Sequence, residues 1–453
     1  MITERDTIFA LSSGRLPAAI AVVRISGPQA GVALRALIGR LPEPRRGALA
    51  RIRRPGTDEL LDEALALWFP APRSETGEDV AELQLHGGRA VLAAVFGALG
   101  ELPGLRPAGP GEFTRRAFLN GQIDLAGVEG LGDLIGAETE AQRRVALRQM
   151  KGALSSQVEI WRGRLIEALA LIEAGIDFAD EGDVPEGLAA QAQAVVRPMA
   201  DEIGRLLAQP AREERLREGL TVAIAGPPNA GKSTLLNALA RRDAAIVSDI
   251  PGTTRDVIEV HLDLEGYPVV LLDTAGIRDT SDPVEREGVR RAEARVADAD
   301  LVLWLRDATD PDAGALPPAA GARAVVWPVT TKSDLKGSDL AGSDFGGKGV
   351  SAEGHVISAQ TGSGMDRLVG AIAAYARDYF APVESGLITR ERQRAALSEA
   401  NAHLRRGLEH GPGAEELVAE DFRLAARALG RVSGRVDVED ILDSIFRDFC
   451  IGK

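Results

Sequence analysis

Cysteine is almost absent from this chain of 453 residues: the only one is Cys450, close to the carboxyl terminus. A single thiol excludes a framework of internal disulfides and a zinc site built from several cysteines, and it fits a reducing compartment. Aromatic residues make up only 4% of the chain, whereas Ala, Leu, Gly and Arg are abundant. This composition favours helix-rich packing over a β-sandwich. From the single cysteine we expect a cytoplasmic protein.

Long hydrophobic runs are also missing. No stretch approaches the roughly 18 consecutive apolar residues of a membrane-spanning helix, so we expect no membrane association. The first residues, MITERDTIFALSSGR, lack the basic region and apolar core of a signal peptide. The net charge of −14 comes from 67 acidic and 53 basic side chains. It argues against a broad basic surface that coats nucleic acid, and it leaves room for a nucleic-acid partner at a local basic patch.

The length predicts about three domains. Along the chain, stretches with three different residue compositions and hydrophobic patterns follow one another. Residues 1–118 mix short β-like runs with Gly/Pro-rich turns, which indicates an α+β domain. Residues 119–215 are helical, and apolar side chains at intervals of three and four between Leu147 and Ile172 predict one long helix in a bundle core.

Residues 216–381 alternate apolar strands with helical segments, which predicts a mostly parallel sheet covered by helices. Within it, the Gly/Ser/Asp-rich stretch 336–354 is expected to be a surface loop. Residues 382–453 are helical again. An α/β region inside a helical one indicates an inserted domain, so the segments that flank it should pack together. The predicted fold class is therefore multidomain, with an α+β domain, a helical bundle and an inserted Ras-like α/β domain.

A phosphate-binding motif opens the inserted domain. Residues 226–233, GPPNAGKS, match G-x-x-x-x-G-K-[ST] and follow a predicted strand, as the motif requires. Its backbone N–H groups would surround phosphates at a helix N-terminus. Lys232 would reach the β- and γ-phosphates, and the Ser233 hydroxyl would coordinate Mg²⁺.

Four further motifs follow in order. Thr254, in GTTRD, would supply a second Mg²⁺ ligand, Asp273 of DTAG would hold the Mg²⁺ shell, and the Gly276 N–H would sense the γ-phosphate. In TKSD, Asp334 offers two acceptor oxygens to the two N–H donors of guanine, a pair that adenine lacks. Ser358-Ala359 would cradle the base. Together the motifs predict a GTP-binding domain.

Two departures from the usual pattern matter. Thr331 replaces the Asn of N-K-x-D; it keeps a hydroxyl that can tie this loop to the phosphate loop, and it loses an amide donor. We expect guanine preference to survive with altered affinity. Ile277 stands where Ras-type enzymes carry a water-orienting Gln, so hydrolysis needs another route.

Asn229 and Glu285 suggest that route. A monovalent cation held by Asn229 could supply the charge of an arginine finger, an effect worth roughly 10³–10⁵ in rate. Glu285 could orient water through a second water molecule, or it could be a solvated carboxylate of a switch helix.

These residues resemble one family over essentially the whole chain. The segments RISG (24–27), TGEDVAELQLHGG (76–88), PGEFTRRAFLNGQIDL (110–125), AAIVSDIPGTTRD, DTAGIRD and the terminal FCIGK, with the inserted GTPase domain, resemble the bacterial tRNA modification GTPases of the MnmE (TrmE) family. That family belongs to the TrmE-Era-EngA-like GTPases.

The resemblance implies an activity and its partners. Family members are GTP hydrolases that work with a FAD-binding subunit, MnmG, in a heterotetramer. They form the 5-carboxymethylaminomethyl or 5-aminomethyl group on the wobble uridine, position 34, of certain tRNAs. The one-carbon unit comes from 5,10-methylene- or 5-formyl-tetrahydrofolate. The family forms homodimers through the N-terminal domain, and GTP hydrolysis drives a K⁺-dependent approach of the GTPase domains.

The resemblance also assigns residues. It implies K⁺ ligation by Asn229, Ser248, Ile250 and Thr253, Mg²⁺ ligation by Ser233 and Thr254, and catalysis by Glu285. Folate contacts map to Arg24, Glu82, Gln122 and Lys453; Gln122 lacks the charge of a lysine, which weakens an ionic contact with the folate tail. The full GTP-binding set is Asn229, Ala230, Gly231, Lys232, Ser233, Thr234, Ser248, Asp249, Ile250, Pro251, Gly252, Thr253, Thr254, Asp273, Thr274, Ala275, Gly276, Thr331, Lys332, Asp334, Ser358 and Ala359.

The amphipathic stretch Val438–Phe449 is expected to dock, with Phe449 buried and Cys450 delivered near the folate pocket. Cys450 then either acts chemically, as nucleophile or general acid/base, or only lines the site. Likewise His86 is either catalytic or a structural turn residue. Three helical arginines, Arg143, Arg144 and Arg148, either contact tRNA or form a solvated face.

Two other functions compete. One is a ribosome-assembly or RNA-chaperone GTPase, and the other is a nucleotide-stabilised scaffold without turnover. The first does not explain the folate-like N-terminal segment or the terminal Cys-Ile-Gly-Lys. The second predicts no turnover, and stimulation of GTP hydrolysis by K⁺ over Na⁺ would exclude it.

Overall fold

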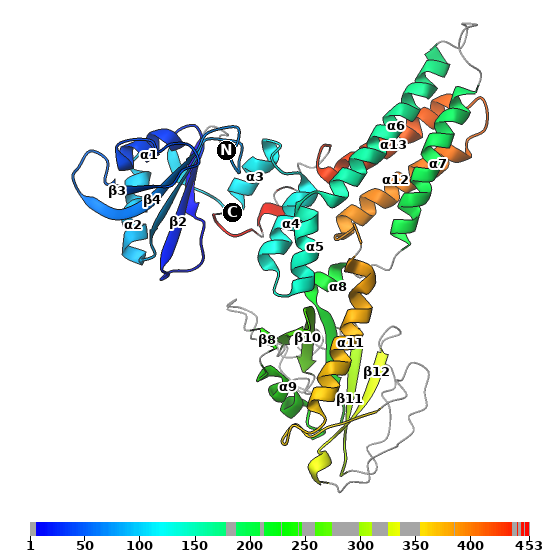
Figure 1. Ribbon diagram of the computed structural model, residues 1–453. Coiled ribbons are helices and arrows are strands. Elements are labelled where there is room, and N and C mark those ends of the chain that lie inside the picture. Colours follow the sequence, from blue (N-terminus) through cyan, green and yellow to red (C-terminus); the bar gives the residue numbers. More distant parts are fainter. Residues whose placement is uncertain are drawn as a thin grey trace, which may run out of the picture. The chain divides into compact units, whose positions relative to one another are not determined.

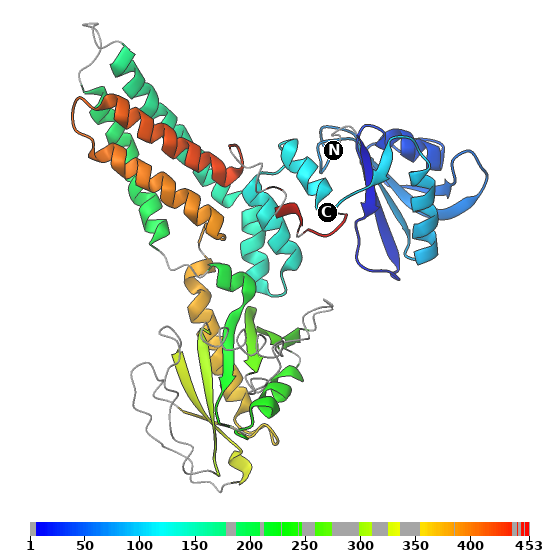
Figure 2. The same ribbon diagram turned by 180° about the vertical axis from the view of Figure 1, so that it is seen from behind.

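The protein is described from a computed structural model, drawn from two sides in Figures 1 and 2. The structure describes residues 6–177, 187–208, 213–227, 229–242, 244–246, 259–273, 299–309, 325–335, 354–384, 386–436, 442, 445–447 and 449–452. The chain forms two compact units. One comprises Met1–Gly132, Gln149–Arg197 and Glu399–Lys453, and the other comprises Asp133–Arg148 and Pro198–Ser398.

A six-stranded sheet opens the first unit, in the order β3-β4-β5-β2-β1-β6. Its strands are β1 (Thr7–Leu11), β2 (Ile20–Ser26), β3 (Ala48–Arg53), β4 (Leu60–Phe69), β5 (Val80–His86) and β6 (Leu105–Pro107). Neighbouring strands are antiparallel except β1 and β6, which are parallel. Helices α1 (Ala30–Ile38) and α2 (Arg89–Gly100) cover one face and bury residues such as Val23 and Leu83.

The opposite face of this sheet carries the residues between the buried ones, because side chains alternate along a strand. Arg24 of β2 and Glu82 of β5 lie there, directly opposite each other in the antiparallel register. Apolar side chains are exposed on the same face: Leu49 is 78% exposed, Ile20 56% and Leu65 36%. This face therefore carries the Arg24–Glu82 pair on its central strands, together with exposed apolar side chains on β2, β3 and β4.

Helices make up the rest of the first unit. They are α3 (Glu112–Leu119), the first residues of α4 (Leu125–Gly136), α6 (Ala153–Asp177), α13 (Glu415–Ser433), and parts of α5 (Glu140–Met150), α7 (Leu188–Leu207) and α12 (Glu391–Glu409). Helices α6 and α13 lie side by side in Figures 1 and 2. The segments that flank the inserted domain in the sequence therefore pack together, as predicted.

The single long helix predicted from the apolar stripe is wrong. The stripe is shared by α5 and α6, and the break falls at Gly152, whose φ of +80° is left-handed. Glycine adopts this conformation without a steric penalty and commonly ends helices. The buried part of the stripe, Leu154, Val158, Trp161, Leu165 and Ile172, lies on α6.

The carboxyl-terminal tail is docked in the first unit. Leu442 and Phe446 are buried against Leu125 and Val128 of α4. Phe449 is half-buried rather than fully buried as expected. Beyond it the chain reaches the N-terminal sheet domain: Ile451 forms a β-bridge with Pro110, and the Ser12 hydroxyl donates to the Gly452 carbonyl at 2.8 Å.

Gly452 allows this contact. It has a φ of +98°, and a Cβ at this position would lie 2.0 Å from the Leu11 carbonyl oxygen. No side chain fits at that distance, so only glycine lets the tail approach the end of β1 this closely.

A seven-stranded sheet forms the core of the second unit, in the order β13-β12-β11-β7-β10-β9-β8. Its strands are β7 (Leu220–Ala225), β8 (Ala245–Ile246), β9 (Glu259–Leu264), β10 (Tyr267–Asp273), β11 (Leu301–Asp307), β12 (Val325–Thr331) and β13 (His355–Val356), with helices α8 (Glu213–Glu218), α9 (Lys232–Ala240) and α11 (Met365–Glu384). The strands from β13 to β10 are parallel, and β9 and β8 are antiparallel. The mostly parallel sheet is thus confirmed. Of the surface loop predicted at 336–354, residues 336–353 lie outside the described part of the chain.

Helix α5 contributes to this second core. Ala141 and Val145 are buried with strand residues such as Leu220 and Val269. The Ala141 N–H also donates to the Gly266 carbonyl, in the turn between β9 and β10, at 3.0 Å. The first turns of α5 therefore pack with the inserted sheet.

We predict that Gly452→Ala releases the tail, because the added Cβ meets the Leu11 carbonyl and the backbone conformation becomes strained by about 1–3 kcal/mol. Hydrogen exchange of peptides that contain residues 107–111 and 449–452 should then become at least roughly tenfold faster. Gly121→Ala is the matched control, since Gly121 also has a positive φ (+68°) but no atom within 4 Å of its Cβ position. Equal protection in wild type and Gly452→Ala would contradict the docked tail.

Candidate functional site

Most of the predicted nucleotide motifs in the described chain meet at one edge of the second sheet. In the parallel registers, Asp273 lies opposite Ile224, Trp304 opposite Ala225 and Asp307 opposite Thr331. The carboxyl ends of β7, β10, β11 and β12 therefore lie side by side, and β13 adds its end next to β12. Ligands of parallel α/β sheets bind at such an edge.

The phosphate loop between β7 and α9 has a backbone that few sequences allow. Gly226 has a φ of +146°, and its Cβ would lie 2.4 Å from the Leu305 carbonyl oxygen. Asn229 (φ +61°) and Gly231 (φ +89°) are also left-handed. The loop ends at the N-terminus of α9, where free N–H groups and the helix dipole favour anions.

Lys232 begins α9, and its ammonium group lies across this loop. Nζ donates to the carbonyl oxygens of Gly226 at 2.8 Å and Pro227 at 3.0 Å. Ser233 and Thr234 follow in the first turn of the helix. The ammonium is thus held at the mouth of the loop, where phosphate oxygens can replace carbonyl oxygens as its acceptors.

Thr331 connects the base-recognition loop with the phosphate loop. Its hydroxyl donates to the Ala230 carbonyl oxygen at 2.7 Å, and both residues are buried. This is the tie that the hydroxyl was predicted to make in place of Asn.

Lys332 and Asp334 follow Thr331 at the same edge. Lys332 has a φ of +55°, and its Nζ lies 2.6 Å from Oδ2 of Asp307. Burial alone would raise the pKa of Asp307, but the bonds from Lys332 and from Thr309 outweigh it and lower the pKa to about 2. Asp334, on the short 3₁₀ helix Ser333–Leu335, is exposed.

The Ser358-Ala359 loop is held by backbone hydrogen bonds within the loop and by the hydroxyl group of Ser358. Ser358 is 1% exposed; its N–H donates to Ser363 O at 2.9 Å, and its Oγ accepts from Thr361 N at 3.2 Å. The Ser333 N–H donates to Ile357 O at 3.2 Å, so this loop and the Thr331–Asp334 loop are neighbours.

Several predicted residues lie outside the described part of the chain. These are Ser248, Asp249, Ile250, Pro251, Gly252, Thr253, Thr254, Thr274, Ala275, Gly276, Glu285 and Lys453. Asp273 ends β10, so its backbone is placed next to β7.

In the N-terminal domain the structure pairs Arg24 with Glu82. Arg24 Nε lies 2.9 Å from Glu82 Oε1, and the two side chains are 17% and 18% exposed. Glu75 forms a second ion pair with Arg24, and the guanidinium lies 5.8 Å from the centroid of the Phe113 ring. The predicted folate residues Arg24 and Glu82 are thus joined in an ion pair.

Gln122 lies beside the same Glu75–Gly77 segment. Its amide is exposed and donates weakly to Asn120 O at 3.4 Å, while Asn120 Nδ2 donates to Thr76 O at 2.7 Å. A Cβ on Gly77 would meet Gln122 Nε2 at 3.1 Å. Cys450 is exposed on the docked tail, and its carbonyl oxygen lies 3.4 Å from the Gly111 N–H.

A buried ion network supports this region. Arg116 bonds Glu78 at 3.1 Å and Glu112 at 3.1 Å, and Arg106 bonds Glu112 at 2.6 Å. Burial would raise the pKa of Glu112, but the bonds from Arg106 and the Gly109 N–H outweigh it and lower that pKa. The network fixes α3 and the Glu75–Glu78 segment against the sheet.

The remaining candidates have partners within the chain. His86 ends β5, and its Nδ1 lies 2.7 Å from Asp62 Oδ1. Arg143 bonds Glu140 at 2.7 Å, with Arg144 4.0 Å from the same carboxylate. Arg148 donates to the Gly386 carbonyl at 2.7 Å.

Comparison with known proteins gives a consistent result over the whole length. Residues 7–122 match the family "GTP-binding protein TrmE N-terminus", and residues 125–450 match "MnmE helical domain". The chain is 58% identical to the tRNA modification GTPase MnmE of Bradyrhizobium sp. (strain ORS 278), over 99% of each chain. It is 55% identical to the same-named protein of Rhodopseudomonas palustris (strain ATCC BAA-98 / CGA009), again over 99% of each chain.

The chain belongs to the MnmE family of tRNA modification GTPases. The predicted family, fold class and enzyme class are thereby confirmed. Among solved structures, a variant of Aquifex aeolicus Era bound to GDP·AlF₄⁻ is 26% identical and covers 40% of this chain and 66% of its own, with a TM-score of 0.25. In the described part of this MnmE family member, no helix combines the length and hydropathy needed to cross a bilayer.

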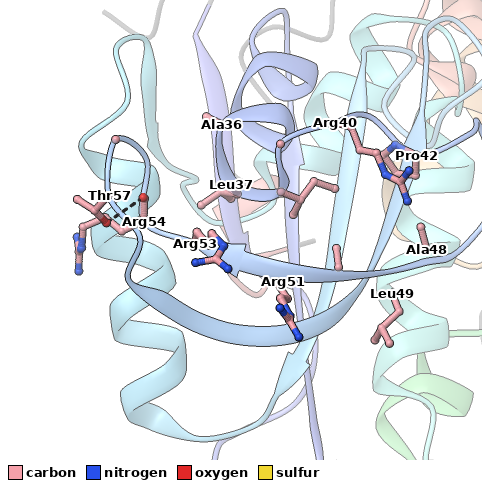
Figure 3. Close-up of a pocket in the computed structure, with 14 residues that line it drawn as sticks. Ala36, Leu37, Arg40, Pro42, Ala48, Leu49, Arg51, Arg53, Arg54 and Thr57 are labelled. Carbon is pink, nitrogen blue, oxygen red and sulfur yellow. Dashed lines mark hydrogen bonds between the residues drawn. The ribbon is translucent and has the colours of Figure 1, made fainter.

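A separate groove of about 430 Å³ lies on this MnmE member's N-terminal domain, between the end of α1 and β3 (Figure 3). Arginines line it, and two of them form ion pairs: Arg51 pairs with Glu63 at 2.9 Å, and Arg54 pairs with Glu59 at 2.6 Å and Glu101 at 2.7 Å. The groove includes none of the predicted site residues.

Sequence reasoning missed Asp307. A signal was available, because Asp307 is an acidic residue two positions after the apolar run Leu301–Leu305, and Asp273 likewise follows an apolar run.

Proposed function

We propose that this MnmE family member is a K⁺-activated GTPase that modifies the wobble uridine of certain tRNAs together with the FAD-binding subunit MnmG. The products are the 5-carboxymethylaminomethyl and 5-aminomethyl groups at position 34, with a tetrahydrofolate one-carbon donor. The observation that carries the proposal is the meeting of phosphate, base and switch-strand motifs at one sheet edge.

The nucleotide would bind along that edge. Lys232 would hold the β- and γ-phosphates, Asp334 would accept the two guanine N–H groups, and the Ser358-Ala359 loop would border the base. The Ser233 hydroxyl and Asp273, at the end of β10, would supply the oxygen donors that Mg²⁺ prefers, and Thr254 would add another. Mg²⁺ would neutralise charge on the β- and γ-phosphates.

Hydrolysis would depend on K⁺ because Ile277 cannot orient water. The Asn229 side-chain oxygen, the Ser248 and Ile250 carbonyls and Thr253 would hold the cation, and Glu285 would orient the attacking water through a second one. The exposure of Asn229 in the phosphate loop supports this role, because a cation in solvent can reach its side chain there.

A folate would bind on the N-terminal domain at Arg24, Glu82, Gln122 and Lys453. The Arg24–Glu82 pair and the exposed Gln122 amide offer hydrogen-bonding groups to a pterin and its glutamate tail. The docked tail supports this assignment because Ile451 and Gly452, next to the proposed catalytic thiol of Cys450, contact the same domain.

The proposed assembly is a homodimer through the N-terminal domain, joined by MnmG in a heterotetramer that acts on tRNA in the cytoplasm. Exposed Leu49, Leu65 and Ile20 on the open sheet face support the dimer, because buried apolar surface stabilises association. GTP hydrolysis would drive the approach of the GTPase domains. We propose domain limits of 1–118, 119–215, 216–381 and 382–453.

A deletion strain tests the function. Its tRNA should lack the modified wobble nucleoside when digested tRNA is analysed by mass spectrometry, and the full-length gene should restore it. An intact modification in the deletion strain would defeat the proposal.

Asn229→Ala should remove the stimulation of GTP hydrolysis by K⁺ over Na⁺ while GDP still binds, because the cation loses its amide oxygen. Alanine is strained at a φ of +61°, so Asn229→Gly is the matched variant that relieves strain and still lacks the amide. Both variants should lose most of an effect of roughly 10³–10⁵. Unchanged K⁺ dependence of the hydrolysis rate in both would rule out the cation site.

A further inference from the structure

The carboxylate of Asp307 is fixed on both oxygens. Oδ2 accepts from Lys332 Nζ at 2.6 Å, and Oδ1 accepts from Thr309 N at 2.9 Å and Thr309 Oγ1 at 2.7 Å. The side chain is 16% exposed. Its orientation is therefore set by the turn that follows β11, before any ligand is considered.

Lys332 is in turn held at both ends. Its backbone has a φ of +55°, which non-glycine residues adopt rarely and keep only where neighbours enforce it. The neighbours are evident: Thr331 is tied to Ala230, and the Ser333 N–H bonds Ile357 O. With Nζ fixed on Asp307, the aliphatic stem of Lys332 has few conformations left.

The ion pair with Asp307 gives Lys332 a different electrostatic environment from that of Lys232, the other lysine of the site. Lys232 donates to the carbonyl oxygens of Gly226 and Pro227 in the phosphate loop. The charge of Lys332 is balanced by Asp307, whose pKa of about 2 keeps it ionised above about pH 4. Lys332 is suited to present its stem rather than its charge.

We propose that Asp307 is a positioning residue for guanine recognition: it holds Lys332 so that the lysine stem forms a fixed apolar wall for the base. Asp334 lies two residues further along and faces solvent, ready to accept from the guanine edge. The inference rests on the proposed GTP site and adds a residue to it. A lysine fixed in advance loses less side-chain entropy when the base binds than a mobile one does.

The test is a double-mutant cycle of Asp307→Asn and Lys332→Met on the full-length protein, with GDP affinity measured by calorimetry. Each single variant should weaken GDP binding roughly tenfold, as expected for a hydrogen bond to a charged group. The double variant should bind no worse than Lys332→Met alone, because Asp307 acts through Lys332. Because the pair is proposed to border the base rather than the reacting phosphate, the loss should appear in the KM for GTP more than in the turnover number.

Two further variants keep the result interpretable. Glu265→Gln removes an exposed carboxylate that pairs with Arg377 at 3.3 Å and should leave GDP affinity unchanged. Thr309→Val loosens Asp307 from the other side and should weaken GDP binding in the same direction but less, which tests the proposal even if Asp307→Asn fails to fold.

Wild-type GDP affinity in folded Asp307→Asn, or a further tenfold loss when it is added to Lys332→Met, would overturn the inference while the GTPase function stands. Failure of the wild-type protein to bind GDP would overturn both.

Discussion

The hydrogen bond from the Thr331 hydroxyl to the Ala230 carbonyl joins the two halves of the nucleotide site, and the other contacts at that edge depend on it. One partner lies in the loop for phosphate and the other begins the loop for the base. Both are buried, so loss of the hydroxyl would leave an unsatisfied carbonyl at a cost of about 1–3 kcal/mol. Lys332 and Asp334 follow Thr331 on the backbone that this bond anchors, and Asp307 bonds Lys332 from the end of β11. A threonine can serve where asparagine is usual because the tie needs one short donor.

A second feature that fixes loops and the tail is close contact between two backbone segments at a glycine, and it occurs in both units. Gly226 lets the phosphate loop touch the carbonyl of Leu305, and Gly452 lets the tail touch the carbonyl of Leu11. In each case the absence of a Cβ lets two backbone segments meet, and the result is a fixed position for the phosphate loop in one unit and for Gly452 of the tail in the other. The glycine of the terminal CIGK sequence of this chain therefore has a steric reason to be there.

Much of the edge site was predictable because each motif follows an apolar strand, and parallel strands bring their carboxyl ends together. The tie by Thr331 followed from its hydroxyl and its place in the loop. The break at Gly152 was missed because the apolar period continues through Leu147, Met150 and Leu154 on either side of it, and periodicity does not report φ. Asp307 was missed because its partner Lys332 lies on the next strand end, and the registers that align β11 with β12 or β2 with β5 are set by tertiary packing. Arg24 and Glu82 were assigned only by family resemblance for the same reason.

The most direct test of the account is the GDP affinity of Thr331→Val, which keeps the shape of the side chain and removes its hydroxyl. The account predicts roughly tenfold weaker binding than wild type, with Thr331→Ser, which keeps the hydroxyl, near the wild-type value. Wild-type affinity in a folded Thr331→Val protein would contradict the claim that this bond unites the two halves of the site.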